Sequence, residues 1–330
     1  MTDNSDPPSG AEAAPSSIPP AVQTRSLSKH YGRHVALVDL DLEIMQGDVF
    51  GYIGPNGAGK STTIRILAGL LRPTKGTAEV CGVNVRKNPQ RIKALVGYMP
   101  DLFGVYENMT LYEYLDFFGA AYLIPRPERK RIIDDVLALT DLGGKRDDQV
   151  SAFSRGMKQR ACLAKTLLHD PKVLILDEPA SGLDPRARIE FRELLRELQA
   201  MGKTIVVSSH ILAELSTICN SVGIIEQGRL LTSGDVGTVL GSLRAHREFV
   251  LSLLDRDRSE HAMSILEAQT VVKEVSNLGG SLRIGLDATE PEIAGIIETL
   301  AREGIRFTEF REERIDLETA FMTLTSGRLA

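Results

Sequence analysis

Between about residues 22 and 234, the hydrophobic positions alternate between runs typical of buried strands and a spacing typical of helices. Residues 49–53 form a short apolar run that ends in a glycine-rich loop, and residues 173–176 and 204–207 are continuous apolar runs. Strands that are buried on both faces of a parallel sheet have such runs. After the loop, one face of a predicted helix carries the apolar residues Ile64, Leu67, Ala68 and Leu71. This pattern predicts an α/β sheet with helices on both sides.

From about residue 88 to residue 165 the spacing becomes helical, which predicts a helical insertion on the α/β core. Thr110 and Glu113 form the capping-box pattern that marks the N-terminus of a helix. One face of that helix carries the apolar residues Leu111, Tyr114, Leu115, Phe118 and Tyr122. A second helix is predicted near residues 129–139.

Beyond residue 234 the pattern changes to short strands that alternate with amphipathic helices. Strands are predicted at residues 247–254, 270–275, 281–286 and 305–311. A first helix is predicted at 261–268, and Thr289 caps a second one, which ends at Gly304, where a left-handed residue is expected. The order strand, helix, strand, strand, helix, strand predicts a small α+β domain of the ferredoxin-like type. Residues 317–324 predict a closing helix.

These changes of pattern divide the chain into three predicted segments. Residues 1–21 are rich in proline, serine and alanine, a composition that cannot bury enough apolar surface to offset the entropy of ordering, so a disordered tail is expected. The α/β domain is predicted at residues 22–234, with its helical part at about 88–165, and an accessory domain at 235–330.

Composition and charge narrow the class of protein. The chain has 330 residues, of which 42% are hydrophobic and 25% charged, which is typical of globular proteins. Its net charge of −5 argues against nucleic acid as a general partner. The three cysteines form no CxxC pair, which excludes a disulfide scaffold and a common zinc ribbon. Neither a long apolar run nor a signal-peptide pattern is present, so a cytoplasmic protein is expected, unless a partner holds it at a membrane.

The loop after the first apolar run has the pattern of a phosphate-binding loop. It matches G-x-x-x-x-G-K-[ST] in the residues Gly54, Pro55, Asn56, Gly57, Ala58, Gly59, Lys60 and Ser61, which Thr62 follows. Glycines let the backbone wrap a phosphate closely, and the N-terminus of the next helix adds positive charge. The ammonium of Lys60 is expected to reach the β- and γ-phosphates, and the hydroxyl of Ser61 to bind Mg²⁺.

Two carboxylates follow the apolar run at residues 173–176. Asp177 is expected to hold Mg²⁺ through water, as nucleoside triphosphatases with a phosphate loop require. Glu178 is placed to accept a proton from an attacking water molecule. Acidic strand ends are common in α/β proteins. The pair therefore indicates a catalytic site only in combination with the phosphate loop.

A third motif lies between these two, at residues 153–160. Ser154 is a good N-cap for a helix whose apolar face carries Met157, Ala161, Ala164 and Leu168. The uncompensated N-terminus of this helix is a second candidate site for an anion. Without the other two motifs it would be read as an ordinary capped helix.

With these three motifs in order, residues 22–234 resemble the ATP-binding subunit of an ABC transporter. The segment from Phe153 to Met157 stands where that family has Leu-Ser-Gly-Gly-Gln, and it keeps Ser154 and Gly156. The resemblance further implies that Tyr31 stacks on adenine, that residues 181–184, with Asp184, form the D-loop, and that His210 senses the γ-phosphate.

One position departs from the family pattern. Asp101 stands where the family has a glutamine; a carboxylate there can contact Mg²⁺ but cannot donate an amide hydrogen bond. In the family, the region that follows lines a groove for the permease. Four apolar residues in this region would serve equally well as part of the hydrophobic core: Leu102, Phe103, Val105 and Tyr106.

The resemblance implies a RecA-like P-loop NTPase core with antiparallel β and helical subdomains, to which the C-terminal domain is added. It also implies ATP and Mg²⁺ as cofactors, a head-to-tail dimer in which Ser154 and Gly156 act on the ATP of the other subunit, and an integral membrane permease as partner. A homodimer is favoured because both half-sites lie on one chain. The variant signature favours export, with the subunit on the inner face of the cell membrane. A soluble ABC ATPase acting on ribosomes or DNA remains an alternative, whereas Glu178 and Lys60 argue against a non-hydrolysing regulatory module.

Overall fold

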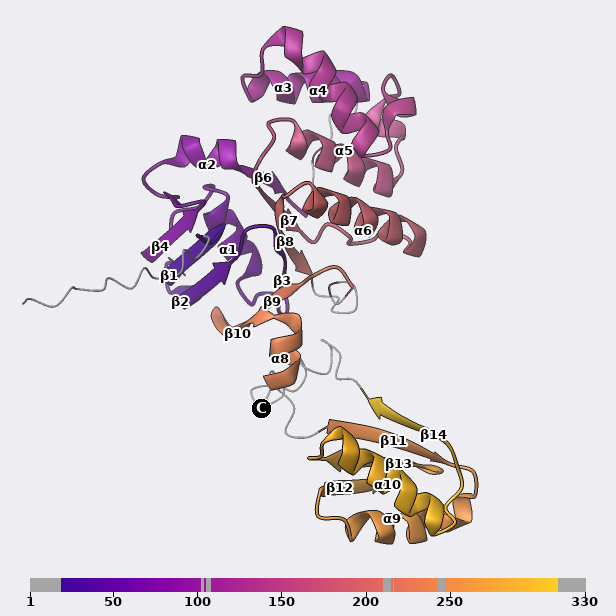
Figure 1. Ribbon diagram of the computed structural model, residues 1–330. Coiled ribbons are helices and arrows are strands. Elements are labelled where there is room, and N and C mark those ends of the chain that lie inside the picture. The colour runs from indigo at the N-terminus through magenta and orange to yellow at the C-terminus, as the bar shows by residue number, and fades with distance from the viewer. Residues whose placement is uncertain are drawn as a thin grey trace, which may run out of the picture. The chain divides into compact units, whose positions relative to one another are not determined.

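The computed structural model describes residues 19–101, 104, 108–209, 215, 217–242 and 247–313 (Figure 1). It divides the chain into two compact units, Met1–His210 with Ile225–Leu230, and Ile211–Ile224 with Leu231–Ala330. Several predictions fall outside the described residues: the tail up to residue 18, the four apolar residues after Asp101, His210 and the helix at 317–324. Ala21, assigned to the predicted tail, is instead buried, and its backbone pairs with Ile44 and Cys81.

A six-stranded sheet with the order β10-β9-β3-β8-β7-β6 contains the predicted apolar runs. Its strands are β3 (Val49–Ile53), β6 (Val96–Met99), β7 (Val173–Asp177), β8 (Thr204–Ser209), β9 (Ser221–Glu226) and β10 (Arg229–Asp235). The pairs β3–β8, β7–β8 and β6–β7 are parallel. Every residue of β3, β7 and β8 is buried, which explains why these strands have no polar alternation.

A four-stranded antiparallel sheet with the order β2-β1-β4-β5 packs beside it. Its strands are β1 (Val22–Tyr31), β2 (His34–Ile44), β4 (Lys75–Val80) and β5 (Val83–Asn84). One hydrophobic core joins both sheets around helix α1 (Lys60–Leu67), to which α1 contributes Ile64, Ile66 and Leu67. Burial of this core from two sides holds α1, and hence the loop before it, in place.

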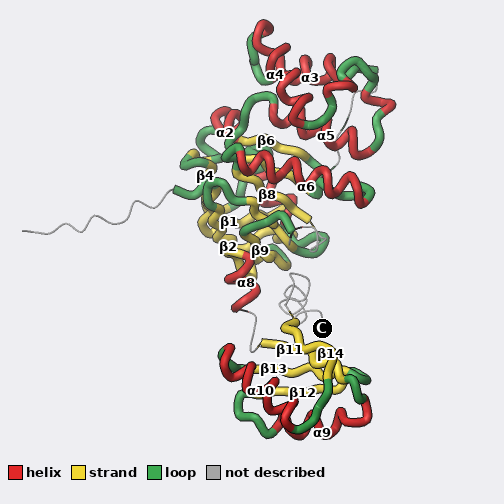
Figure 2. Tube along the Cα trace, turned by 45° about the vertical axis from the view of Figure 1, so that its right-hand side comes forward, coloured by secondary structure: helices red, strands yellow, loops and turns green. Residues whose placement is uncertain are grey.

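Helices α3 (Leu111–Ala121), α4 (Arg126–Leu139) and α5 (Arg155–Leu167) gather at one end of the first unit (Figures 1 and 2). The capping box at Thr110 is formed, because its side chain accepts from the Glu113 amide and the Glu113 carboxylate accepts from the Thr110 amide. This unit also contains α2 (Pro89–Leu95), α6 (Pro185–Ala200) and the short helices η1 (Gly143–Lys145) and η2 (Val150–Ala152).

The helical insertion predicted at about 88–165 contains one strand that was not predicted, β6, which belongs to the main sheet. Gly97 interrupts the apolar run there for a packing reason. A Cβ at this position would lie 2.7 Å from the Thr166 side chain of α5. The close approach of α5 thus requires a glycine in the strand and hides the strand pattern.

The C-terminal part of the second unit has the predicted order of elements. Its strands are β11 (Arg247–Leu253), β12 (Val272–Asn277), β13 (Ser281–Leu286) and β14 (Phe307–Glu313), and its helices are η3 (Arg256–Arg258), α9 (Ser259–Glu267) and α10 (Glu290–Arg302). The antiparallel sheet has the order β12-β13-β11-β14, which is the ferredoxin-like arrangement. Thr289 caps α10 as predicted, in a capping box with Glu292, and Gly304 has the expected positive φ of 70°.

Helix α8 (Val236–Ser242) follows β10. None of the helices in the described part of the chain has the length and hydrophobicity of a transmembrane segment.

Candidate functional site

The glycine-rich loop is held between β3 and the N-terminus of α1. Gly57 and Gly59 have φ angles of 81° and 111°, which favour glycine. A Cβ on Gly54 would lie 2.3 Å from the Ile225 carbonyl, and one on Gly59 would lie 2.8 Å from the Ala36 carbonyl. The loop therefore needs glycines both for its conformation and for its close contact with the strands behind it.

Lys60 is the first residue of α1 and is only 6% exposed. Its ammonium donates to the carbonyls of Gly54 at 2.5 Å and Pro55 at 3.3 Å, and lies 4.0 Å from Oε1 of Glu178. Burial lowers the pKa of Lys60, while the carboxylates of Glu178 and Asp177 oppose this shift. The ammonium is thus bound within the loop by two carbonyl oxygens, which phosphate oxygens could replace as acceptors.

The carboxylate of Asp177, at the end of β7, faces the start of α1. Its Oδ1 accepts from the Ser61 hydroxyl at 3.4 Å and from the Ser208 hydroxyl at 2.7 Å. Asp177 is 4% exposed, so its charge is held in a nearly dry environment by these two hydroxyls. Hard oxygen donors of this kind suit Mg²⁺, which prefers one or two carboxylates supplemented by phosphates and water.

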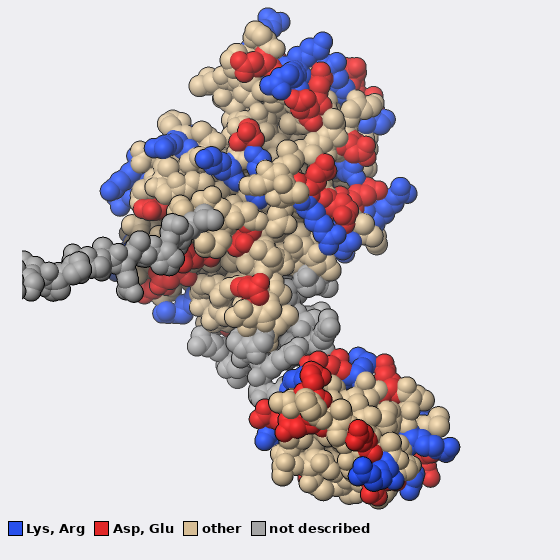
Figure 3. Space-filling model, viewed as in Figure 1, with Lys and Arg blue, Asp and Glu red and all other residues tan. Residues whose placement is uncertain are grey.

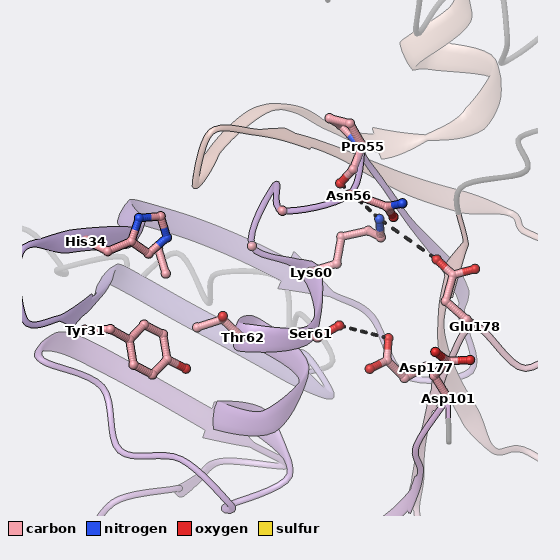
Figure 4. Close-up of a pocket in the computed structure, with 13 residues that line it drawn as sticks. Tyr31, His34, Pro55, Asn56, Lys60, Ser61, Thr62, Asp101, Asp177 and Glu178 are labelled. Carbon is pink, nitrogen blue, oxygen red and sulfur yellow. Dashed lines mark hydrogen bonds and ion pairs between the residues drawn. The ribbon is translucent and has the colours of Figure 1, made fainter. Parts of the chain in front are cut away.

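Glu178 follows Asp177 in a left-handed conformation, with a φ of 50°. Its amide donates to the Ser208 side chain at 3.0 Å, so Ser208 on β8 holds both acidic residues. The left-handed backbone carries the Glu178 carboxylate out of the strand direction and toward Lys60 (Figure 4). A half-buried carboxylate near a cation has the geometry of a proton acceptor for water.

A cavity of about 310 Å³ joins these groups to the hairpin between β1 and β2 (Figure 4). Its lining contains Tyr31, His34, Ala36, Pro55, Asn56, Gly57, Gly59, Lys60, Ser61, Thr62, Asp101, Asp177 and Glu178. Eleven of these thirteen residues were predicted from the sequence. Nine belong to the phosphate-loop pattern with Thr62 or to the carboxylate pair, Asp101 follows β6, and Tyr31 belongs to the hairpin. The other two loop residues, Gly54 and Ala58, are buried and do not line the cavity.

His34 and Ala36 also line the cavity but were not predicted from the sequence. Tyr31 and His34 are direct partners across the hairpin, and both side chains face the cavity (Figure 4). Residues opposite each other in an antiparallel pair lie on the same face of the sheet. The short turn after Tyr31, with a positive φ at Gly32, was the signal that could have identified His34.

Three further predicted residues do not line this cavity. Ser154 caps α5 by accepting from the Met157 amide at 3.3 Å, and Gly156 lies within the first turn. Asp184 caps α6 by accepting from the Ala187 amide at 2.9 Å. The guanidinium of Arg155 lies against Gly182, close enough that a Cβ there would be 2.5 Å from its Cζ. The segment at residues 154–156 and the predicted D-loop are therefore neighbours in one chain, and neither contributes to the lining of this cavity.

Comparisons with known proteins agree with the resemblance to ATP-binding subunits of ABC transporters. The family model of the ABC transporter matches residues 37–181. The bacitracin transport ATP-binding protein BcrA of Bacillus licheniformis is 40% identical over 232 residues, 70% of this chain and 75% of that protein. The linearmycin resistance ATP-binding protein LnrL of Bacillus subtilis (strain 168) is 28% identical over 310 residues, 93% of this chain and 99% of that protein. A solved ATP-binding subunit of an ABC transporter is 32% identical, with a TM-score of 0.61, and covers 67% of this chain and 92% of that one.

The family match runs from β2, behind the phosphate loop, to residue 181, beyond the two carboxylates. It thus includes ten of the thirteen residues that line the cavity, and the similarity to LnrL continues into the second unit. The chain therefore belongs to the ABC transporter family, as an ATP-binding subunit with ATPase activity.

Proposed function

We propose that the cavity binds one ATP with Mg²⁺, the nucleoside at Tyr31 and His34 and the triphosphate at the loop. The observation that carries this proposal is the convergence of a buried ammonium, a hydroxyl–carboxylate pair and a second carboxylate. Lys60 lies 4.0 Å from Glu178, and Ser61 lies 3.4 Å from Asp177. Mg²⁺ bound by Ser61, Asp177 and Asp101 would neutralise charge on the phosphates.

Hydrolysis then requires the chain to activate water and stabilise charge. Glu178 accepts a proton from the water whose oxygen attacks the γ-phosphorus, and the bond from phosphorus to the β-γ bridging oxygen breaks to leave ADP and phosphate. Lys60 follows the phosphate oxygens as their charge is redistributed. His210 acts as the sensor of the γ-phosphate.

The working form is a homodimer. Ser154 and Gly156, at the exposed N-terminus of α5, contact the γ-phosphate of the ATP held by the second copy, and Asp184 lies at the same interface. None of the three lines the cavity of its own chain, which supports this role. ATP closes the dimer and hydrolysis opens it, which is the ligand-driven equilibrium that a permease can follow.

The permease is proposed to dock in a second cavity of about 870 Å³. This cavity lies between the end of α1, β6 and the turn from α3 to α4. Its rim exposes two large apolar side chains, Leu70 at 58% and Leu123 at 88%. Exposed apolar side chains that cluster around a cavity mark a surface for a partner.

The transport direction is proposed to be export, from the cytoplasm across the cell membrane. One relative supports this direction by its name: the Nod factor export ATP-binding protein I of Cupriavidus metallidurans is 37% identical over 213 residues, 64% of this chain and 70% of that protein. Nucleic acid is not expected as a partner. On the face that Figure 3 draws, Lys and Arg side chains are interspersed with Asp and Glu over the described residues, so no extended basic area is in view.

The test of the site is a comparison of full-length native protein with Glu178→Gln. Loss of a general base is expected to reduce ATP turnover about 10²- to 10⁴-fold. ATP binding should persist, since the amide leaves the loop and Lys60 intact. Turnover of Glu178→Gln within a few-fold of the native rate would exclude Glu178 as the base.

The test of the partner uses tagged Glu178→Gln protein, recovered from detergent-solubilised cells with ATP present. An integral membrane protein in stoichiometric amount supports the transporter role, whereas recovery of ribosomes supports the soluble alternative. Leu123→Asn, placed at a φ of 62° that asparagine tolerates, should release the permease without changing ATP binding. The control is Met201→Asn, at an apolar residue that is 59% exposed but lies outside this cavity, and this variant should retain the permease.

A further inference from the structure

The turn between β9 and β10 packs behind the phosphate loop. Its two central residues, Gln227 and Gly228, have φ angles of 47° and 77°, as in a type I′ hairpin turn. Gln227 is exposed, whereas Gly228 is buried. The turn lies outside the cavity lining, so the chemistry described above gives it no role.

Both backbone groups of Gly228 are bonded, each to a different element. Its amide donates to the Ala58 carbonyl at 2.9 Å, and its carbonyl accepts from the Val38 amide of β2 at 2.8 Å. A Cβ on Gly228 would lie 2.6 Å from the Ala36 carbonyl. Gly228 therefore bridges β2 and the phosphate loop in a space that admits no side chain.

The bond to Ala58 determines how the next peptide group is oriented. In a trans peptide the carbonyl and the following amide point in opposite directions. With the Ala58 carbonyl held on the turn, the Gly59 amide must point away from Gly228. Gly59 lines the cavity, and a Cβ on it would lie against Leu37 and the Ala36 carbonyl, so the side-chain direction is closed and the cavity is open to this amide.

We propose that Gly228 is a positioning residue for ATP binding, which holds the Ala58–Gly59 peptide so that the Gly59 amide donates to a phosphate. The proposal rests on the proposed role of the phosphate loop. It assigns part of the binding geometry to a turn that lies some 170 residues later in the sequence.

The experiment measures ATP turnover against ATP concentration on the full-length chain. Gly228→Ala introduces a Cβ that cannot fit against Ala36 and should displace the turn from Ala58. Gly202→Ala is the matched control, because Gly202 has a similar φ of 82° with no atom within 4 Å of an added Cβ. A glycine inserted after Gln227 lengthens the turn without a Cβ, and it keeps the test available if Gly228→Ala does not fold.

Loss of one hydrogen bond to a charged phosphate should raise KM for ATP on the order of tenfold in Gly228→Ala and in the insertion, with kcat within about threefold. Gly202→Ala should keep the native KM. A merely structural role would instead lower kcat through loss of folded protein at unchanged KM, and that result would overturn the proposal. So would an equal rise of KM in Gly202→Ala. Unchanged ATP binding in Lys60→Ala would refute the proposed role of the loop itself, separately from Gly228.

Discussion

Replacement of Lys60 by alanine removes the single cationic side chain of the phosphate loop, which is buried. Its charge at about 4 Å from a phosphate oxygen would contribute about 4 kcal/mol at an effective dielectric constant of 20. The ammonium already donates to Gly54 and Pro55, however, and ATP binding exchanges these bonds for new ones. The net value is therefore that of a charged hydrogen bond, about 1.5–3 kcal/mol. This corresponds to ATP binding that is weaker by about 10- to 150-fold.

Isothermal titration of the full-length protein with ATP and Mg²⁺ measures this loss directly. Lys203→Ala is the matched control, since the Lys203 ammonium also donates to a carbonyl, that of Pro171 at 2.9 Å, and its side chain is 13% exposed. It lies outside the nucleotide cavity, so its removal should leave ATP affinity unchanged. A folded Lys60→Ala protein that binds ATP within about threefold of the native affinity would refute the reasoning.

Three further outcomes are expected. His34→Ala should weaken ATP binding about 2- to 10-fold through loss of one hydrogen bond. The control is His30→Ala, at an exposed residue of β1 outside the cavity lining, which should leave the calorimetric Kd unchanged. Because Glu178 raises the pKa of Lys60, Glu178→Gln should lower that pKa. The charged ammonium that binds phosphate exists below its pKa, so ATP affinity measured from about pH 7 to 10 should fall at a lower pH than in the native protein; a fall at the same or a higher pH would contradict this. Leu300→Ala should destabilise the C-terminal unit by about 2–5 kcal/mol and lower only its transition in calorimetric unfolding, with ATP affinity retained; a shift of every transition would show that the two units unfold together.

Most elements of the fold are predicted from the sequence because they depend on residues that are close together in the chain. The buried strands β3, β7 and β8 are confirmed, since both of their faces need apolar side chains. The predicted helix caps at Thr110 and Thr289 are also confirmed, and they were predictable because each depends on residues three positions apart. The strand β6 was missed because Gly97 serves the packing of α5, a contact that local spacing does not encode.

The same distinction applies to the site. The phosphate loop and the two carboxylates are visible as motifs, but His34 enters the cavity only through its pairing with Tyr31. Ser208 is less predictable, because its hydroxyl reaches Asp177 from a neighbouring strand whose register no local pattern specifies. Contacts between residues distant in sequence depend on the assembled sheet, and single-sequence patterns do not report them.

The left-handed backbone at Glu178 has a consequence for how this protein can evolve. A non-glycine residue at a φ of 50° is strained by about 1 kcal/mol or more. Glycine or asparagine would relieve that strain, yet neither carries a carboxylate. With Glu178 as the proposed general base, stability and turnover therefore select different amino acids at this position, a trade-off common at active sites. Substitution by glycine or asparagine is then expected to give a chain that is more stable and still binds ATP, but hydrolyses it far more slowly.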